Sequence, residues 1–299
     1  MYPAPIESLH GPTTIEEALR LLAEADKREV MCIAGGMSLM QAVKARVVRP
    51  EVVVDLNRLD MLRGVERGAG GIEVGSMTCY VDLAREPLLR DNAFAAISDA
   101  AARVGDRQVR NRGTIGGSLC WNYVAACLPA AALAVDGQLE LLSLDGDGIS
   151  SRTIGIDDFL TGPLETAREP HELLRSITLP DPGPGGGSAY KKWGPVTASL
   201  PVVGIAVRVI VDRAGACREA RVAIAGLVEG TQRLVSVEEG LIGLSIADAG
   251  AIEGVFEAAG AEAEVQGDQW ATEDYRRLLI REIGGEVTMT ALKRAGKAH

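Results

Sequence analysis

Apolar side chains near the start of the chain recur at the spacing of one helix face. Within residues 14–25 they occupy three- and four-residue intervals, at Ile15, Ala18, Leu19 and Leu22. Thr13 and Glu16 match a capping box, in which a hydroxyl and a carboxylate satisfy the first N–H groups of a helix. The pattern predicts an amphipathic helix over residues 14–25.

The next apolar runs are too short for helices and predict strands. Residues 30–34 form one such run, and the apolar run within residues 51–56 is typical of a buried strand. Between them, residues 39–47 have a helical pattern. A strand, turn, helix and strand in this order favour a parallel or mixed sheet with ligands at the strand ends.

A glycine-rich break at residues 68–71 separates this unit from a second set of elements. A strand is predicted at 72–77, and alanine-rich helices follow through Val104. Residues 124–135 are small and compatible with a helix, and residues 138–144 form another apolar strand. The simplest interpretation is a second α/β unit.

The clearest linker lies at residues 181–188, DPGPGGGS, where no apolar period survives. Beyond it, two apolar segments flank the turn-like residues 213–215 and predict a long hairpin. Helical patterns then dominate over residues 247–259 and from Glu273 to the end. We therefore place the main domain boundary at the linker and expect a small antiparallel sheet packed against helices beyond it.

The composition limits which classes of protein this chain can belong to. The 299 residues include 47% apolar side chains, enough for packed cores, and carry a formal net charge of −10. That charge argues against broad attraction to nucleic acid or anionic lipid, so an anionic ligand must be held by local groups. Arg208 interrupts the most promising apolar run, and residues 1–10 lack the features of a secretion signal. We expect a soluble cytoplasmic protein without a membrane span.

Cysteines and histidines offer neither a metal site nor a nucleophile. The five cysteines are scattered without a Cys-x-x-Cys pair, at Cys32, Cys79, Cys120, Cys127 and Cys217. Cys120 and Cys127 are close in sequence, but no third or fourth ligand stands near them. The three histidines are isolated from one another, at His10, His171 and His299. We expect no metal and no catalytic residue in this chain, and the cysteines are too few and wrongly spaced for iron–sulfur clusters.

Two glycine pairs stand out, in IAGGMSLM (residues 33–40) and RNRGTIGGSL (residues 110–119). Glycine lets the main chain approach a ligand closely, and the N–H groups of such a turn can donate to phosphate oxygens. Ser38, Thr114 and Ser118 add hydroxyl groups. One such turn is more often a plain turn or helix start, but two with matching flanks can hold one diphosphate from both sides. Neither pair has the spacing of a P-loop or of a Rossmann fingerprint.

The segment IAGGMSLMQAVKARVVRPEVVVDLNRL, with RNRGTIGGSL, YKKW and the overall length, closely resembles the FAD-binding medium subunit of the molybdenum hydroxylases. That family includes carbon monoxide, xanthine, nicotinate and quinoline dehydrogenases and aldehyde oxidoreductases. The resemblance covers most of the chain and is weakest after about residue 230.

The resemblance implies an α+β chain with two domains. A two-lobed FAD-binding domain of the vanillyl-alcohol oxidase (PCMH) type is expected in residues 1–180, with lobes of about 1–58 and 59–180. A small carboxy-terminal domain with an antiparallel sheet and helices is expected in residues 188–299. In such subunits the pyrophosphate of FAD lies between the two glycine loops.

Residues of this sequence that match the family's FAD-binding motifs are implied to bind the cofactor. The first loop supplies Ala34, Gly35, Gly36, Met37, Ser38 and Leu39. The second loop supplies Thr114, Ile115, Gly116, Gly117 and Ser118. Lys192, in YKKW, matches a flavin-proximal lysine, and residues 157–162, DDFLTG, resemble a Phe-Phe-x-Gly loop near the flavin.

The sequence departs from the family after the second loop. Most relatives carry an Asp-Pro-x-x-Asp string there, whereas this chain has Tyr123, Val124 and Cys127. Both carboxylates are absent, so we expect the local contacts and the flavin potential to differ from those of the relatives. Tyr123 either stacks on the isoalloxazine ring or packs in the core. Arg110 and Arg112 either touch phosphate or form surface salt links.

The resemblance further implies partner chains, a molybdopterin-binding large subunit and a small subunit with two [2Fe–2S] clusters, assembled as a dimer of heterotrimers. This chain would then carry electrons from the iron–sulfur clusters to an external acceptor. Two alternatives remain, a self-sufficient flavin oxidase of the same fold and a scaffold that has lost its flavin. The sequence names neither the hydroxylated substrate nor the terminal acceptor.

Overall fold

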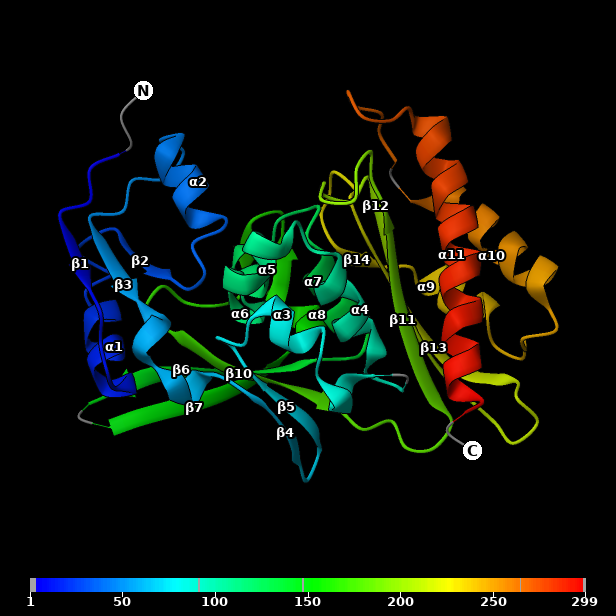
Figure 1. Cartoon of the computed structure of the whole chain (residues 1–299), viewed down its shortest axis with the longest axis horizontal. Coiled ribbons are helices and arrows are strands. Elements are labelled where there is room, and N and C mark those ends of the chain that lie inside the picture. The colour runs from blue at the N-terminus through cyan, green and yellow to red at the C-terminus, as the bar shows by residue number, and fades with distance from the viewer. Residues whose placement is uncertain (1–3, 91, 147, 264, 298–299) are drawn as a thin grey trace.

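The computed structural model describes residues 4–90, 92–146, 148–263 and 265–297. The chain forms a small N-terminal lobe, a central lobe and a C-terminal domain that lie side by side (Figure 1). The outermost positions of the predicted domains, residues 1–3 and 298–299, lie outside the described residues.

The N-terminal lobe is built on a three-stranded parallel sheet, as the pattern predicted. Its strands, in spatial order, are β1 (Ser8–His10), β3 (Val52–Asp55) and β2 (Val30–Ile33). Two helices accompany the sheet, α1 (Ile15–Leu22) and α2 (Leu39–Lys44). Short 3₁₀ turns, η1 (Leu56–Arg58) and η2 (Asp60–Leu62), lead out of it. The glycine segment between β2 and α2 therefore lies at the carboxyl end of a parallel strand, where ligands bind in such sheets.

The first helix buries the predicted face, but its cap lies one residue later than predicted. Thr14 is the N-cap, and its hydroxyl accepts the N–H of Glu17 at 3.2 Å. The Glu17 carboxylate in turn accepts the N–H of Thr13 at 2.8 Å. The predicted pairing of Thr13 with Glu16 is wrong because an N-cap must immediately precede the first helical residue, here Ile15.

The central lobe contains an antiparallel sheet rather than a second α/β unit. Its strands, in spatial order, are β4 (Val65–Gly68), β5 (Gly71–Gly75), β10 (Leu173–Pro180), β6 (Gln138–Asp145) and β7 (Gly148–Gly155). Every neighbouring pair is antiparallel. The prediction failed because β10, the last of these five strands along the chain, inserts between β5 and β6 and removes the pairing that a βαβ unit requires.

Helices of the central lobe cover the sheet and separate it from the C-terminal domain (Figure 1). They are α3 (Tyr80–Leu83), η3 (Pro87–Leu89), α4 (Ala95–Arg103), α5 (Arg107–Arg112), α6 (Ile115–Trp121), α7 (Cys127–Ala134) and α8 (Ile156–Phe159). A two-stranded ribbon, β8 (Leu160–Gly162) and β9 (Glu165–Thr166), follows α8. The side chains of α7 are all buried, as expected of a helix enclosed by protein.

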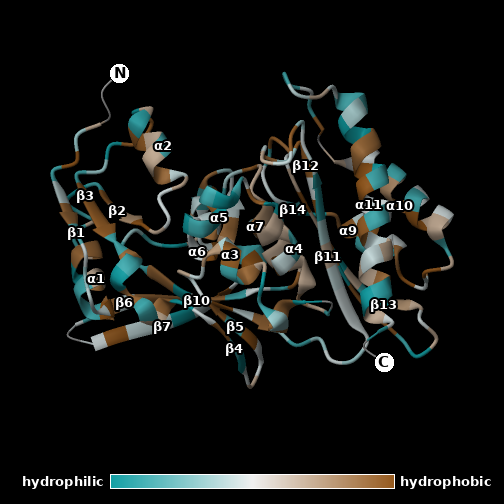
Figure 2. Cartoon of the chain, viewed as in Figure 1, coloured by the Kyte–Doolittle hydropathy of each residue, from teal (hydrophilic) through white to brown (hydrophobic). Residues whose placement is uncertain are grey.

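The C-terminal domain is a four-stranded antiparallel sheet with helices, as predicted. Its strands are β11 (Gly186–Trp193), β12 (Val203–Val211), β13 (Cys217–Ala225) and β14 (Gln232–Arg233). Its helices are α9 (Val235–Gly240), α10 (Ala249–Glu262) and α11 (Glu273–Ala295). The predicted hairpin is the antiparallel pair β12 and β13. Figure 2 shows that α10 and α11 mix hydrophilic and apolar residues, as expected of helices that cover one face of a sheet.

The C-terminal sheet is covered on both faces, which joins the two domains through a common core. All nine residues of β12 are buried. Val207 and its cross-strand partner Val222 belong to the core formed with α10 and α11. Ala206 and its partner Ala223 face the other way, into the core formed with α4 and α7. This double burial explains why β12 is a nearly continuous apolar run.

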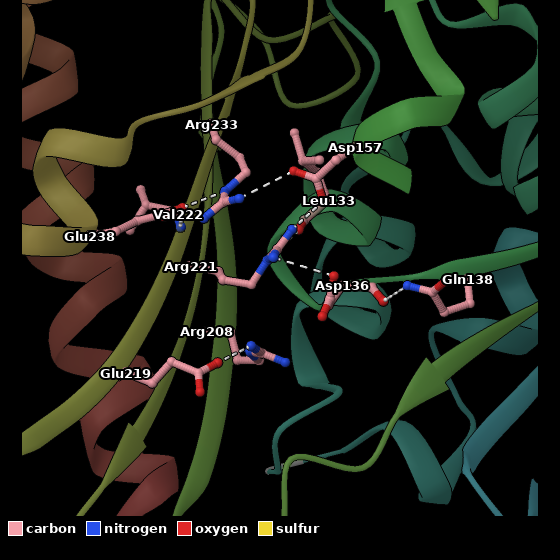
Figure 3. Close-up of polar contacts among 10 residues, drawn as sticks. All are labelled: Leu133, Asp136, Gln138, Asp157, Arg208, Glu219, Arg221, Val222, Arg233 and Glu238. Atoms are coloured by element: carbon pink, nitrogen blue, oxygen red, sulfur yellow. Dashed lines mark hydrogen bonds and ion pairs between the residues drawn. The ribbon is translucent and has the colours of Figure 1, made fainter. Parts of the chain in front are cut away.

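Polar contacts complete this boundary between the domains (Figure 3). Arg221 of β13 donates to the carbonyl oxygen of Leu133 at 3.3 Å and pairs with Asp136 and Asp157. Asp157 also pairs with Arg233, at 3.3 Å. Because the Arg221 side chain is only 13% exposed, these contacts fix the C-terminal sheet against α7 and α8 more firmly than an exposed pair could.

The predicted linker at 181–188 is too long, because its last three residues belong to β11. Gly187 packs directly against α11, where a β carbon would overlap the carbonyl oxygen of Ala291. Ser188 is fully buried, and its hydroxyl accepts the N–H of Ala96 at 2.9 Å. These small residues serve close packing, a need that composition alone does not distinguish from a loop.

Candidate functional site

A cavity of about 510 Å³ is lined by residues of two glycine segments, the first within residues 33–40 and the second within residues 110–119. Its volume is in the range of roughly 300–1,000 Å³ that is usual for ligand sites. The predicted residues that line it are Ala34, Gly35, Gly36, Met37, Ser38, Leu39, Thr114, Gly116, Gly117, Ser118, Tyr123 and Lys192. The structure thus brings together residues from both lobes and from β11.

Ile115 is the one predicted site residue that does not line the cavity. Its side chain is fully buried in the core of the central lobe. In TIGGS, isoleucine therefore anchors the start of α6, while the residues on either side of it face the cavity.

The first glycine segment presents unused donors. Among the described residues, no hydrogen bond accounts for the N–H groups of residues 35–38. Gly36 has a φ of +73°, a left-handed conformation that glycine adopts at little cost. The chain therefore turns sharply after β2 and leaves successive N–H groups available to an anionic ligand.

The second glycine segment differs from the prediction, because its N–H groups are already used. Ile115 donates to the carbonyl oxygen of Thr78 at 3.1 Å, and Gly116 donates to that of Ser76 at 2.8 Å. Gly117 donates to the Thr114 hydroxyl, which caps α6, at 3.1 Å. The expectation of free N–H groups in both segments thus holds for the first only. The second segment offers the cavity hydroxyl groups and a wall of small residues.

The two segments touch, and glycine makes the contact possible. A β carbon at Gly35 would overlap the carbonyl oxygen of Arg112. A β carbon at Gly117 would lie 3.5 Å from the β carbon of Ala34. By contrast, a β carbon at Gly116 would lie 2.7 Å from the carbonyl oxygen of Ser76, away from the first segment. The distance from Gly117 to Ala34 is an ordinary contact distance, so a methyl group at position 117 would fit against the first segment, whereas Gly116 is required by the packing of α6.

Asn57 holds the first segment in place and escaped the sequence analysis. Its side-chain amide donates to the carbonyl oxygen of Ala34 at 2.8 Å and to the Asp55 carboxylate at 2.6 Å. Arg63 donates to the Asn57 amide oxygen at 3.3 Å. The only signal in the sequence was the string DLNRL, which carries the family resemblance without revealing a role.

Lys192, Cys127 and Tyr123 also line the cavity, and Cys127 lies near enough to Lys192 to affect its pKa. Tyr123 is 38% exposed, so the alternative that it packs in the core is wrong. Lys192 is half-buried, and its ammonium donates to the carbonyl oxygen of Ser199. Burial lowers the pKa of Lys192 from its usual value, and the charges of Arg103 and Arg110 lower it further.

The cavity wall also contains charged residues that the sequence analysis missed, among them Arg168 and Glu172. Arg168 lines the cavity and donates to the carbonyl oxygens of Glu169 and Glu172, each at 2.8 Å. The Glu172 carboxylate is buried and accepts two hydrogen bonds from Arg152, at 2.6 and 2.7 Å. Burial raises the pKa of Glu172, but the Arg152 hydrogen bonds, the N–H of Glu169 and the positive charge of Arg152 together outweigh it, so the pKa is lowered.

Several other candidates lie away from the cavity. None of residues 157–162 lines it; Asp157 lies at the domain boundary and Phe159 is fully buried. Arg110 donates to the carbonyl oxygens of Val104 and Gly105, at 3.0 and 2.8 Å, and forms neither a predicted salt link nor part of the cavity wall. Within the described ranges no histidine lines the cavity, no cluster of His, Cys, Asp or Glu suits a metal, and no helix could span a membrane.

Comparison with known proteins decides the family. The profile described as "FAD binding domain in molybdopterin dehydrogenase" matches residues 5–182, and "CO dehydrogenase flavoprotein C-terminal domain" matches residues 188–291. This chain belongs to the FAD-binding medium subunits of the molybdenum hydroxylases. As a member of that family it binds FAD and is one subunit of a molybdenum-dependent oxidoreductase.

Individual relatives support the assignment of this medium subunit over nearly its full length. It is 31% identical to the 6-hydroxypseudooxynicotine dehydrogenase complex subunit alpha of Paenarthrobacter nicotinovorans, covering 94% of this chain and 93% of the relative. It is 29% identical to the carbon monoxide dehydrogenase medium chain of Hydrogenophaga pseudoflava, covering 96% of each.

Solved structures show the same fold. The carbon monoxide dehydrogenase structure from Hydrogenophaga pseudoflava superposes with a TM-score of 0.88, at 29% identity, over 98% of this chain and 99% of that chain. Quinoline 2-oxidoreductase from Pseudomonas putida gives a TM-score of 0.87 at 25% identity, over 99% of each chain. The expected α+β fold, an FAD-binding domain followed by a C-terminal domain, is confirmed.

Proposed function

We propose that FAD occupies the cavity between the glycine segments and that the chain passes electrons from iron–sulfur clusters to an external acceptor. The observation that supports this most directly is that residues 35–38 line the cavity and that their N–H groups form no hydrogen bond among the described residues. Such a run suits a pyrophosphate, because it supplies local positive potential in a protein whose net charge is −10.

In this proposal different residues bind different parts of the cofactor. Residues 35–38 donate to the pyrophosphate, and the hydroxyls of Thr114 and Ser118 close the site from the other side. Tyr123 and Lys192 contact the isoalloxazine ring. When bound, FAD supplies a ring that accepts and releases electrons, while the protein sets its position and its electrostatic surroundings.

We further propose that the chain works with a molybdopterin-binding large subunit and a small subunit carrying two [2Fe–2S] clusters, as a dimer of heterotrimers in the cytoplasm. The relatives support an assembly of this kind, since they are named as medium chains or as a subunit of a complex. The proposed domain boundaries place the FAD-binding domain in residues 1–180 and the C-terminal domain in residues 188–299.

No observation favours the self-sufficient oxidase or the flavin-free scaffold. Among the described residues, the cavity wall contains no histidine that could attach a flavin. The lining includes three cysteines, Cys32, Cys120 and Cys127, and burial raises the pKa of each thiol. Neutral thiols are weak nucleophiles, so these three cysteines are poorly suited to covalent attachment of a flavin.

Two measurements test the proposal. The visible spectrum of the purified chain should show bound flavin, and a colourless chain that takes up no FAD would overturn the proposed site. The FAD-loaded chain should then be mixed anaerobically with aldehydes and N-heterocycles. We expect dithionite to bleach the flavin and these substrates to bleach it only when the copurifying partner chains are present. Fast bleaching of the isolated chain by one substrate would favour the self-sufficient oxidase.

A further inference from the structure

The positive charge around Lys192 has no partner of opposite sign among the described residues. Lys192 lines the cavity, and Arg103 and Arg110 lie near enough to lower its pKa by repulsion. Among the described residues none of the three forms an ion pair with a carboxylate. Their polar partners are carbonyl oxygens instead: those of Ser199 for Lys192, Tyr190 for Arg103, and Val104 and Gly105 for Arg110.

The groups beside Lys192 that could carry negative charge are held neutral. Cys127 is 4% exposed, and burial raises the pKa of its thiol. Tyr190 is 1% exposed, and burial raises the pKa of its hydroxyl well above its usual value. The Asp99 carboxylate, which accepts the N–H of Tyr190, is paired with Arg294 at 2.6 Å. The positive charge around Lys192 is therefore not offset by the neighbouring side chains.

We propose that Lys192 makes the bound flavin easier to reduce, because its charge stabilises the negative charge that the ring gains on reduction. This inference rests on the proposed FAD site. A fixed charge acts strongly in a half-buried setting, since screening by water is weaker there. Lys192 thus tunes the cofactor in addition to contacting it.

Strand geometry supplies a matched control. Lys191 and Lys192 are neighbours in β11, so their side chains point to opposite faces of the sheet. The Lys191 ammonium pairs with Glu286 of α11, on the face away from the cavity. Replacing either lysine by glutamine removes the same charge from the same strand, but only Lys192→Gln removes it from the cavity.

Sulfite provides a probe that needs no turnover. The lone pair of sulfite forms a bond to the flavin N5, and the ring takes up the electron pair as negative charge. An adjacent cation should therefore favour the adduct. We expect Lys192→Gln to weaken sulfite binding to the FAD-loaded chain about tenfold. The same factor in the two-electron reduction equilibrium corresponds to a midpoint potential about 30 mV lower. Lys192→Arg should restore both values, and Lys191→Gln should leave both unchanged.

The outcomes separate this inference from the proposed site. Flavin content is measured first, and a wild-type chain that takes up no FAD would refute both. A flavin-loaded Lys192→Gln chain with unchanged sulfite affinity and potential would overturn the role of Lys192 alone. If that variant loses its flavin, Cys127→Asp provides the test, because a carboxylate beside Lys192 should lower the potential, whereas Cys127→Ser should not. An unchanged potential in Cys127→Asp would also overturn the inference.

Discussion

Gly35 lies directly against the main chain of Arg112, so that a β carbon at position 35 would overlap the Arg112 carbonyl oxygen. This contact joins the two glycine segments, which are far apart in the sequence, and closes one side of the cavity. Because neither main chain can move without disturbing its own lobe, the spacing between the segments depends on glycine at position 35.

Gly116 and Gly117 should respond differently to substitution by alanine. A β carbon at Gly116 would lie 2.6 Å from the Ser76 side chain, so Gly116→Ala should lower the free energy of unfolding by about 1–3 kcal/mol. A β carbon at Gly117 would enter the gap toward Ala34, so Gly117→Ala should weaken FAD binding about tenfold with a smaller loss of stability. Chemical unfolding and FAD titration of both variants measure the difference. Equal effects of both variants on FAD would contradict separate roles.

Asn57→Ala should loosen the first glycine segment. The variant loses the hydrogen bond to the Ala34 carbonyl oxygen, and a lost hydrogen bond costs about 1 kcal/mol. We expect FAD to bind about five- to tenfold more weakly, as measured by fluorescence titration. Asn111→Ala is the control, since Asn111 is exposed and its side chain forms no hydrogen bond among the described residues. Normal FAD affinity in Asn57→Ala would show that the segment holds its shape without this bond.

Glu172 should make stability depend on pH. Its pKa in the folded protein is lowered, so its contribution is present above the pKa of an unfolded glutamate, about 4.3, and is lost as pH falls through the folded value. At pH 7, Glu172→Gln should therefore lower the free energy of unfolding by about 1–3 kcal/mol, because Arg152 loses its charged partner.

As pH falls below about 4 and through the lowered pKa of Glu172 in the folded protein, the difference between the wild type and Glu172→Gln should shrink, because the wild-type carboxyl then becomes protonated. Chemical unfolding at both pH values checks this, with the exposed Glu24→Gln as control. A difference that stays constant across this range would mean that the ion pair with Arg152 is not the cause.

FAD should be bound without a covalent bond. No histidine among the described residues lines the cavity, and burial raises the pKa of Cys32 to about 11, which keeps its thiol neutral. Acid precipitation should thus release all flavin into the supernatant, where its absorbance is measured. A pellet that retains flavin absorbance after washing would contradict this expectation.

The sequence by itself determined the features that depend only on residues close to one another along the chain. The helical face of Ala18, Leu19 and Leu22 is set by spacing, and the β12–β13 hairpin by two apolar runs around a short turn. The same holds for the glycine segments, because the left-handed turn at Gly36 and the Thr114 cap are local. Family resemblance to the flavoprotein subunits rested on these same strings, and the comparisons confirm it.

Only the tertiary structure decided how distant segments meet. The insertion of β10 between β5 and β6 is settled by which faces can be buried together, and no local pattern records it. The same is true of the N–H groups of Ile115 and Gly116, which are used by the carbonyl oxygens of Thr78 and Ser76 and so are not available to a ligand. The charge around Lys192 is likewise a property of its surroundings, because burial keeps Cys127 and Tyr190 neutral. Hydrogen-bond partners and desolvation are fixed by folding, so a sequence can identify such residues while the folded chain determines what they are able to bind.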